Sequence, residues 1–313
     1  MAAKKYYLCA VTLELHTPQD GFYKGTRFDK GGVFKSLVFG GVEMCGQWFE
    51  SYSPTMHDAV LGPAEEFSPM PVTPGTAHVT HSTSHITPSH SPVTPGPSPV
   101  IPGPDRGSHI LLKPGVGLID IGTEPYDRFK LYRIVDPGRW EVDGMRFRHI
   151  LEGYYDYTKE IVVTGENSFE IRHCYKAFSA YEGDVYNHNF FTFGKLEIGP
   201  TRLIDFPFRP EGTWRAEYDS VGFTESGIRF SRQLQKGESV YTGNIHEAGK
   251  EGMPYAMSIS EGPLRVSIQG DAPVFKTVLW ANHRIACLEP YNRISSLPGH
   301  DFRWNIEYTL IYE

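Results

Sequence analysis

Apolar and polar residues alternate with a period of two along much of this chain. The alternation is nearly complete at 302–312, where one face would carry Phe302, Trp304, Ile306, Tyr308, Leu310 and Tyr312. Because successive side chains of a strand point to opposite faces of a sheet, this segment is predicted to be a strand with one buried face. The same pattern at 169–175 places His173 on the apolar face and predicts a packed histidine.

Shorter segments with strand character follow one another along the sequence. They are predicted at 5–13, 33–39, 130–135, 145–150, 154–163, 201–206, 255–260, 264–269, 275–280 and 284–288. Turn-forming pairs such as Pro137-Gly138 and Pro298-Gly299 separate them, and no long segment has the 3.6-residue period of a helix. We therefore predict an all-β chain of antiparallel sheets packed as a large sandwich, with a single domain over residues 1–313.

One segment, at about 68–108, departs from this pattern. It consists mainly of Pro, Ser, Thr, Gly and His, with near-repeats at 91–97 and 98–104. Such a composition buries too little apolar surface to offset the entropy of ordering, so we predict a disordered insertion within the domain. Its histidines lack the spacing of a rigid metal site, and no cysteine lies nearby.

Composition narrows the classes of partner. The net charge is −7 without a dense basic tract, which disfavours a nucleic-acid partner. No apolar run reaches 18 residues, and residues 1–7 lack the apolar core of a secretory signal, so we expect no membrane span and a cytoplasmic protein. The four cysteines lie far apart and are expected to be reduced, with no metal bound. Glycine-rich phosphate loops are absent, and we expect no cofactor.

The densest chemistry lies at 186–191, which reads Tyr-Asn-His-Asn-Phe-Phe. In an extended chain Tyr186, His188 and Phe190 share one face, while Asn187 and Asn189 share the other. A histidine between aromatic rings can deliver a proton to a flat, partly apolar ligand such as a sugar. The alternative is a core histidine whose ring nitrogens are satisfied by the backbone.

Several segments together resemble the galactose mutarotase-like superfamily, which includes the aldose 1-epimerases. They are 25–29 (Gly-Thr-Arg-Phe-Asp), 46–49, 57–67, 113–119, 186–191 and 287–290 (Cys-Leu-Glu-Pro), in matching order over nearly the whole chain apart from the insertion. The resemblance is greatest to uncharacterised bacterial-type members, and it implies a β-supersandwich fold.

The resemblance also implies a catalytic pair. His188 falls at the family's histidine that protonates the sugar ring oxygen, and Glu289 falls at the glutamate that takes the proton of the anomeric hydroxyl. From the residues alone, 284–288 is a strand that would place Cys287 and Glu289 on one face, and Pro290 is expected to end it because it has no N–H for the ladder. A solvated acid at a strand end is the alternative for Glu289.

Six further residues are candidates for binding the substrate. Arg27 falls where the family often has an arginine, and His57 resembles a second family histidine, although His-Asp-Ala replaces the usual His-Gly-Gly. The others are Glu65, Tyr186, Asn187 and Trp280. Tyr186 and Trp280 could stack on a pyranose, although large aromatics more often lie in a core. Glu65 could face a sugar or form a solvated edge.

Two functions remain open from the sequence. The first is a cofactor-independent isomerase in carbohydrate metabolism, of the aldose 1-epimerase type, that interconverts sugar anomers through His188 and Glu289. The second is a carbohydrate-binding supersandwich without turnover. Convergence of the two side chains on one open pocket would favour the enzyme, whereas wide separation or burial of either would favour the binding protein. The sequence specifies neither the sugar nor the oligomeric state.

Overall fold

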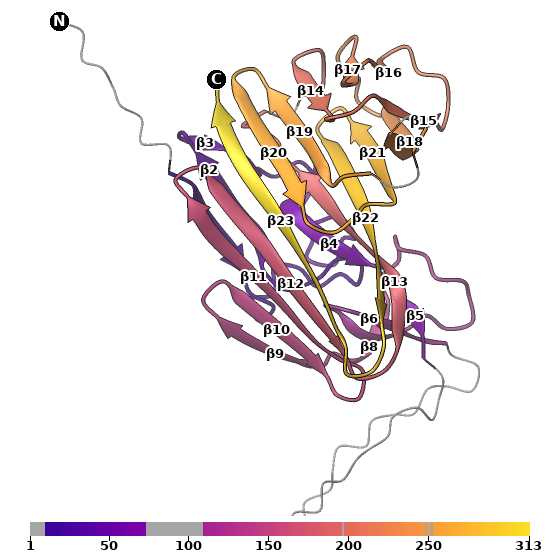
Figure 1. Cartoon of the computed structure of the whole chain (residues 1–313). Helices are drawn as coiled ribbons and strands as arrows, with labels where there is room; N and C mark the ends of the chain where they lie inside the picture. The colour runs from indigo at the N-terminus through magenta and orange to yellow at the C-terminus, as the bar shows by residue number, and fades with distance from the viewer. Residues whose placement is uncertain (1–9, 73–108, 196, 248, 251–252) are drawn as a thin grey trace, which may run out of the picture.

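The structure is a computed structural model that describes residues 10–72, 109–195, 197–247, 249–250 and 253–313 (Figure 1). Within these residues every regular element is a β-strand, and all strand pairs are antiparallel. No described segment forms a helix, and so none is a candidate for a membrane-crossing helix. The predicted all-β class is confirmed.

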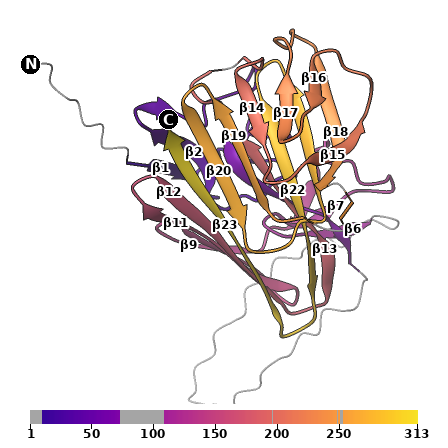
Figure 2. The same cartoon turned by 45° about the horizontal axis from the view of Figure 1, so that its top comes forward.

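The largest sheet has ten strands. In spatial order they are β16 (Val221–Phe223), β17 (Gly227–Phe230), β14 (Arg202–Asp205), β19 (Ala256–Glu261), β20 (Leu264–Gly270), β23 (Asp301–Tyr312), β12 (Ser168–Ala177), β11 (Tyr155–Gly165), β10 (Arg146–Leu151) and β9 (Arg139–Asp143). Figures 1 and 2 show the long strands β11, β12, β23 and β20 side by side.

A six-stranded sheet carries the chemistry discussed below. Its order is β15 (Pro210–Trp214), β18 (Ser239–Glu247), β21 (Lys276–Asn282), β22 (Ala286–Ser296), β13 (Tyr181–Phe190) and β4 (Gly62–Phe67). Two smaller sheets complete the described part. They are β1 (Thr12–His16), β2 (Val33–Phe39), β3 (Val42–Glu43), and β5 (Met70–Pro71), β6 (Ile110–Lys113), β7 (Gly117–Asp120), β8 (Arg133–Asp136).

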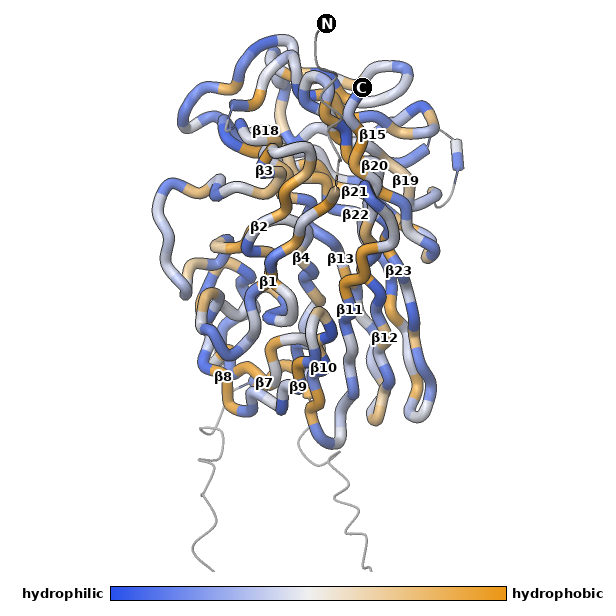
Figure 3. The backbone as a smooth tube through the Cα atoms, turned by 90° about the vertical axis from the view of Figure 1, so that its left-hand side faces the viewer, coloured by the Kyte–Doolittle hydropathy of each residue, from blue (hydrophilic) through white to orange (hydrophobic). Residues whose placement is uncertain are grey.

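The two large sheets pack face to face through side chains of both. Phe67 of β4 contacts the rings of Tyr157 on β11 and Trp304 on β23, with centroid distances of 5.3 and 6.3 Å. Along β23 the burial alternates as predicted, with Trp304, Ile306, Tyr308 and Leu310 in the core. Figure 3 shows the corresponding alternation of hydrophobic and hydrophilic segments along β12 and β23.

His173 of β12 is a packed residue, as predicted. Its ring is buried and stacks on Trp304 of the neighbouring strand at 4.3 Å and 2°. The sandwich thus has a core in which aromatic and polar rings are layered together.

Two expected boundaries differ from those of the structure. The insertion was expected to begin at about residue 68, whereas Met70 and Pro71 form β5 and pair with β6. Residues 73–108, which include the rest of the insertion, lie outside the described residues, as do residues 1–9. The strand expected at 284–288 runs instead to Ser296, through Pro290.

Pro290 is accommodated because a side chain replaces part of the ladder. The register of β13 with β22 sets Asn187 opposite Pro290, which has no N–H to donate. The side-chain amide of Asn189 donates instead to the Asn187 carbonyl at 3.3 Å and to the Leu288 carbonyl at 2.9 Å. The strand therefore continues through the proline.

Candidate active site

Alternation along β13 sorts the residues of the 186–191 stretch between two faces of the six-stranded sheet. Tyr186 pairs with Glu66 of β4 and with Tyr291 of β22, so these three side chains share one face. His188 lies two residues along the same face, and the register sets it opposite Glu289 of β22. Neighbouring strands therefore bring a histidine and two glutamates together.

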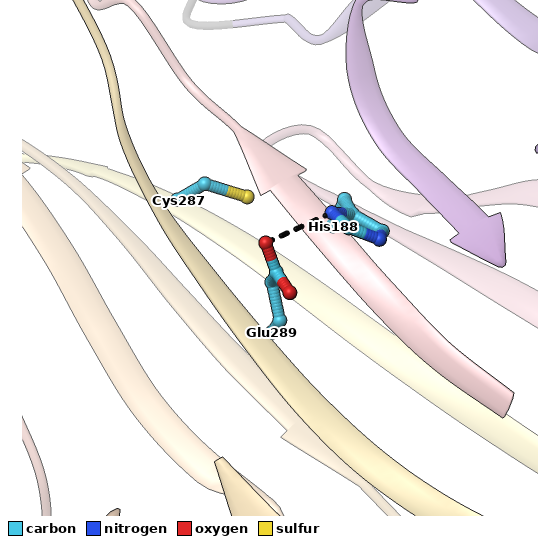
Figure 4. Close-up of side chains that lie close together, drawn as sticks. All are labelled: His188, Cys287 and Glu289. Atoms are coloured by element: carbon cyan, nitrogen blue, oxygen red, sulfur yellow. Dashed lines mark ion pairs between the residues drawn. The ribbon is translucent and has the colours of Figure 1, made fainter. Parts of the chain in front are cut away.

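The His188 ring lies between these two carboxylates. Its Nε2 is 3.2 Å from Oε2 of Glu66. Its Nδ1 is 3.1 Å from Oε1 of Glu289, and this second contact is the dashed line in Figure 4. The first contact has the geometry of a hydrogen bond, whereas the second is an ion-pair contact that leaves the buried Nδ1 without a hydrogen-bond partner. The ring is fixed by Phe28, which meets it edge-on at 4.9 Å, and by Phe190 at 5.5 Å.

Glu66 is held as a carboxylate by the cations around it. Nε of Arg27 donates to Oε2 at 2.7 Å, while Arg128 and Lys113 lie 3.8 and 4.0 Å from Oε1. Burial alone would raise the pKa of Glu66, but Arg27, His188 and Lys113 together place it well below its usual range. The acceptor for the Nε2 proton of His188 is thus permanently charged.

Lys113 stands behind this group, fully buried. Its ammonium donates to the Phe67 carbonyl and to the Tyr126 hydroxyl, each at 2.9 Å. Burial lowers the pKa of Lys113 to about 8, against the opposing attraction of Glu66.

A cavity of about 240 Å³ opens over His188 and Glu289. Five of the predicted site residues line it, namely Arg27, His57, His188, Trp280 and Glu289. They come from the β1–β2 loop, the β3–β4 loop, β13, β21 and β22, so the long-range pairing of strands brings them together. Trp48 and Phe190, which stack at 4.9 Å, contribute apolar walls.

Three predicted residues lie outside the cavity lining. Tyr186 is on the same face but is covered by Tyr291, on which it stacks at 4.1 Å. Glu65 and Asn187 are on the opposite face, which packs against the ten-stranded sheet. The side chains of these two residues lie between the sheets, away from the cavity. Each is the sequence neighbour of a residue on the cavity face, and successive side chains of a strand point to opposite faces.

Glu65 and Asn187 belong to a buried polar network between the sheets. Oε1 of Glu65 accepts from His173 at 3.1 Å and from the Asn187 amide at 3.3 Å, while Oε2 accepts from Lys159. Oδ1 of Asn187 accepts from the Tyr308 hydroxyl at 2.7 Å. Burial opposes ionisation of Glu65, but Lys159 and His173 outweigh it and lower its pKa.

Asp29 joins this network from the β1–β2 loop. Its Oδ2 is 3.9 Å from the Lys159 ammonium and accepts from the Tyr157 hydroxyl at 3.1 Å, while its Oδ1 accepts from the Gly31 amide at 2.9 Å. Burial raises the pKa of Asp29, and the nearby charge of Glu65 adds to this against the attraction of Lys159. Two carboxylates therefore share one lysine.

Several cavity residues were not predicted from the sequence. Arg128 and Phe129 belong to the β7–β8 loop, Arg215 follows β15, and Tyr241 is on β18. Arg128 and Phe129 are loop residues without a periodic signal, so the sequence pattern offers no way to find them. From the sequence, Glu66 shares with its neighbour Glu65 the two alternatives of facing a sugar or forming a solvated edge, and only Glu65 was predicted to be a site residue. The strand at 62–67 puts the two on opposite faces, and it is Glu66 that lies on the cavity face.

The nearest candidate for metal ligation is formed by His188, Cys287 and Glu289. Their ligand atoms lie within 4.8 Å of one another (Figure 4). A thiol must lose its proton to bind a metal, and burial together with the charge of Glu289 raises the pKa of Cys287 well above its usual value. The group therefore suits a metal poorly, and a metal-free site stays a prediction.

Comparison with known proteins supports the fold. No family model matches the sequence, and no curated protein matches it significantly. Among solved structures, a candidate aldose 1-epimerase from Escherichia coli K12 is 8% identical, with 97% of this chain and 100% of that chain covered at a TM-score of 0.52. The Slr1438 protein from Synechocystis sp. PCC 6803 is 11% identical, with both chains covered completely, also at 0.52. The chain has the galactose mutarotase-like fold.

At these identities the likeness concerns the fold alone. The galactose mutarotase-like fold was predicted from sequence motifs, and the complete coverage of both neighbours confirms it. What the cavity does must be argued from its own residues.

Proposed function

We propose that this protein interconverts the anomers of a sugar by general acid–base catalysis, with His188 as the acid and Glu289 as the base. The observation that carries the proposal is that the two side chains, 101 positions apart in the sequence, meet at 3.1 Å in one cavity. The E. coli neighbour described as a candidate aldose 1-epimerase supports the same reaction class by analogy of fold.

The reaction requires two proton transfers, one at each of the two oxygens bonded to the anomeric carbon. Glu289 takes the proton of the anomeric hydroxyl, and His188 delivers a proton to the ring oxygen, so the bond between the anomeric carbon and the ring oxygen breaks and an open-chain aldehyde forms. Rotation about the adjacent carbon–carbon bond and return of both protons closes the ring as the other anomer. No atom is gained or lost.

Glu66 is a positioning residue in this scheme. As a carboxylate that stays ionised, it accepts a hydrogen bond from Nε2–H and so directs Nδ1 toward Glu289 and the cavity. A ring protonated on both nitrogens then donates to Glu66 on one side and presents Nδ1–H to a ligand on the other. Trp280, Trp48 and Phe190 supply apolar surface on which a sugar ring can stack.

The second candidate, a sugar-binding protein without turnover, is favoured by one observation. The His188 side chain is only 1% exposed, and its Nδ1 contacts Glu289 directly, so a sugar must separate the two groups before either can act on it. The two candidates predict the same binding site and differ in turnover.

Anomer exchange measured by NMR over a panel of aldoses decides between them. For an enzyme, His188→Asn and Glu289→Gln should each slow exchange by about 10²–10⁴-fold. The loss of rate in the double variant should be much smaller than the product of the two single losses. Glu307→Gln, an exposed glutamate on β23, is the control and should retain full activity. If Glu289→Gln turns over a bound sugar as fast as the unchanged protein, the catalytic roles are refuted and binding alone remains.

A further inference from the structure

The cavity is rich in arginine although the chain as a whole is acidic. Four basic side chains lie in or directly behind it, Arg27, Lys113, Arg128 and Arg215, against three carboxylates, Asp58, Glu66 and Glu289. The chain as a whole carries a net charge of −7, so this local excess of positive charge runs against its average. A cleft in which charges of one sign are concentrated favours a ligand with charge of the opposite sign.

Glu66 cannot pair closely with all of these cations. It is already engaged by Arg27 at 2.7 Å and by His188 at 3.2 Å. Arg128 reaches the same carboxylate only at 3.8 Å, and its side chain remains 39% exposed. Arg128 thus shares an acceptor that three other positive or proton-donating groups already surround. Tyr291 is a further hydrogen-bond partner of its guanidinium, which lies 5.3 Å from the centroid of the Tyr186 ring, and no carboxylate of the described residues is closer than that of Glu66.

Arg215 has no acidic partner at all within the described part of the chain. It lies at the end of β15, where its backbone N–H donates to the Tyr241 carbonyl at 3.0 Å, and its side chain lines the cavity. No ion pair joins its guanidinium to any carboxylate in residues 10–72, 109–195, 197–247, 249–250 or 253–313, which the structure describes.

Tyr241 interacts electrostatically both with Arg128 and Arg215 and with Glu289 of the candidate catalytic pair. Burial raises the pKa of its phenol, the charge of Glu289 adds to the rise, and the charges of Arg128 and Arg215 oppose it. One phenol is therefore within electrostatic reach of the proposed base and of both arginines. Arg128 and Arg215 come from the β7–β8 loop and from the end of β15, so they approach the cavity from different elements.

A neutral sugar offers hydroxyl oxygens as acceptors but no negative charge, so it would leave the charge of these guanidinium groups uncompensated when it displaced their water, which is costly. A carboxylate or phosphate instead accepts two parallel N–H bonds from the planar fork of an arginine. The cavity volume of about 240 Å³ lies below the range of roughly 300–1,000 Å³ for drug-sized ligands, which suits a single sugar unit.

We propose that the ligand of this cavity is an acidic monosaccharide, whose carboxylate or phosphate group binds Arg128 and Arg215 while its anomeric carbon lies at His188 and Glu289. The inference rests on the proposed sugar-binding function and names its substrate class. The shared chemistry is an anionic group on the sugar, in the form of either a uronic acid or a sugar phosphate.

Matched sets of sugars test the proposal on the full-length protein. Glucose, glucuronic acid and glucose 6-phosphate form one set, and the corresponding galactose compounds form another. Binding is measured by calorimetry and anomer exchange by NMR, with acetate and inorganic phosphate as free-anion probes. We expect one acidic member of a set to bind about 10- to 100-fold more tightly than its neutral member.

Charge removal and salt provide the second readout. Arg128→Gln and Arg215→Gln should each lower the ratio of acidic to neutral affinity by about 10-fold, whereas Arg303→Gln, an exposed arginine outside the cavity lining, should not change it. Raising the salt concentration should weaken binding of the acidic sugar and leave that of the neutral sugar unaltered.

The outcomes separate this inference from the proposed reaction. Acidic sugars that bind in preference but are not interconverted support the ligand class and refute the catalysis. Neutral sugars that are turned over as well as acidic ones support the catalysis and overturn the ligand class. Equal or absent binding of all members, or tight binding of free phosphate with no gain from the sugar, also overturns the inference.

Discussion

The two faces of β4 and β13 carry polar networks made from the same residue types. On the inner face, Glu65 contacts Lys159, His173 and Asn187 between the sheets. On the cavity face, Glu66 contacts Arg27 and His188. Glu65 and Glu66 are adjacent in the sequence, and so are Asn187 and His188, so one step along a strand decides to which network a residue belongs.

The networks differ in how completely they are satisfied. Both oxygens of Glu65 have partners, and its lysine is shared with Asp29, so the inner network is closed. The cavity network contains an Nδ1 on His188 without a hydrogen-bond partner and an arginine, Arg215, without an ion pair among the described residues. A closed network stabilises the fold, whereas an open one has capacity left for a ligand.

The largest effect on stability is expected from Lys159→Met, which breaks the inner network. It leaves Glu65 and Asp29 buried without their cation, and removing one partner of a buried ion pair costs about 3–5 kcal/mol. Urea unfolding measures the loss. Lys176→Met, at an exposed position of the neighbouring strand β12, is the control and should change the free energy of unfolding little.

If the networks are independent, the folded Lys159→Met protein should bind a cavity ligand with unchanged affinity. A large change in that affinity would show that the two faces are coupled and would break the comparison.

A smaller effect, with a defined pH window, is expected from Lys113 in the cavity network. Its pKa is about 8 in the folded protein and 10.5 without the fold, so between these values the folded state has lost a proton that the unfolded state keeps. The cost of burying the charge is fully present below pH 8 and disappears as the pH rises, so stability increases through this window. Lys113→Met should remove about 2–3 kcal/mol of that increase.

The measurement is the difference in unfolding free energy between the unchanged protein and Lys113→Met, at pH 8 and pH 10. Lys30, whose pKa burial also lowers to about 8, is present in both proteins and cancels in the difference. Parallel pH curves for the two proteins would contradict the burial of the Lys113 charge.

Glu66→Gln should change how the stability of the protein depends on pH below neutrality. The folded pKa of Glu66 is lowered, so its charge stabilises the protein above its ordinary pKa near 4.5, and this contribution is lost as the pH falls. The variant should be less stable than the unchanged protein at pH 7 by about 1–3 kcal/mol, and the difference should shrink toward pH 3. A difference that grows on acidification would have the wrong sign for a charged Glu66.

Asp29→Asn should change the pH dependence of stability in the opposite direction to Glu66→Gln. Because the folded pKa of Asp29 is raised, the unchanged protein loses stability as the pH rises from about 4 toward neutrality, and the variant should not. Asparagine keeps an acceptor for the Gly31 amide, so the fold is retained. Thermal unfolding at pH 4 and pH 7 should show the variant gaining relative to the unchanged protein at the higher pH.

Local periodicity accounts for what the sequence predicted well. The strand at 302–312 and the packed His173 follow from alternation alone, because one face of each strand is buried. The strand β4 was missed, since Gly-Pro-Ala-Glu-Glu-Phe has no apolar alternation and all six residues are buried. The carboxylates of Glu65 and Glu66 are stabilised by Lys159 and Arg27, respectively. These partners are 94 and 39 residues away in the sequence, so a local pattern does not include them.

The candidate site was predictable only in part, because only some of its residues stand in local sequence motifs. His188 and Glu289 stand in motifs, and the structure brings them together, whereas Arg128, Arg215 and Tyr241 reach the cavity only through the path of loops and strand order. Pro290 shows a further limit, because the Asn189 side chain that lets the strand continue belongs to another strand.

Alternation on β13, β18 and β21 also makes this protein a convenient scaffold for engineering. Positions such as Phe190, Tyr241 and Trp280 contribute side chains to the cavity, while their immediate neighbours in the sequence face elsewhere. A library restricted to these positions would vary what the cavity recognises without altering the contacts between Glu65, Lys159 and Asn187. Selection for a new ligand would then leave the residues of the inner network unchanged.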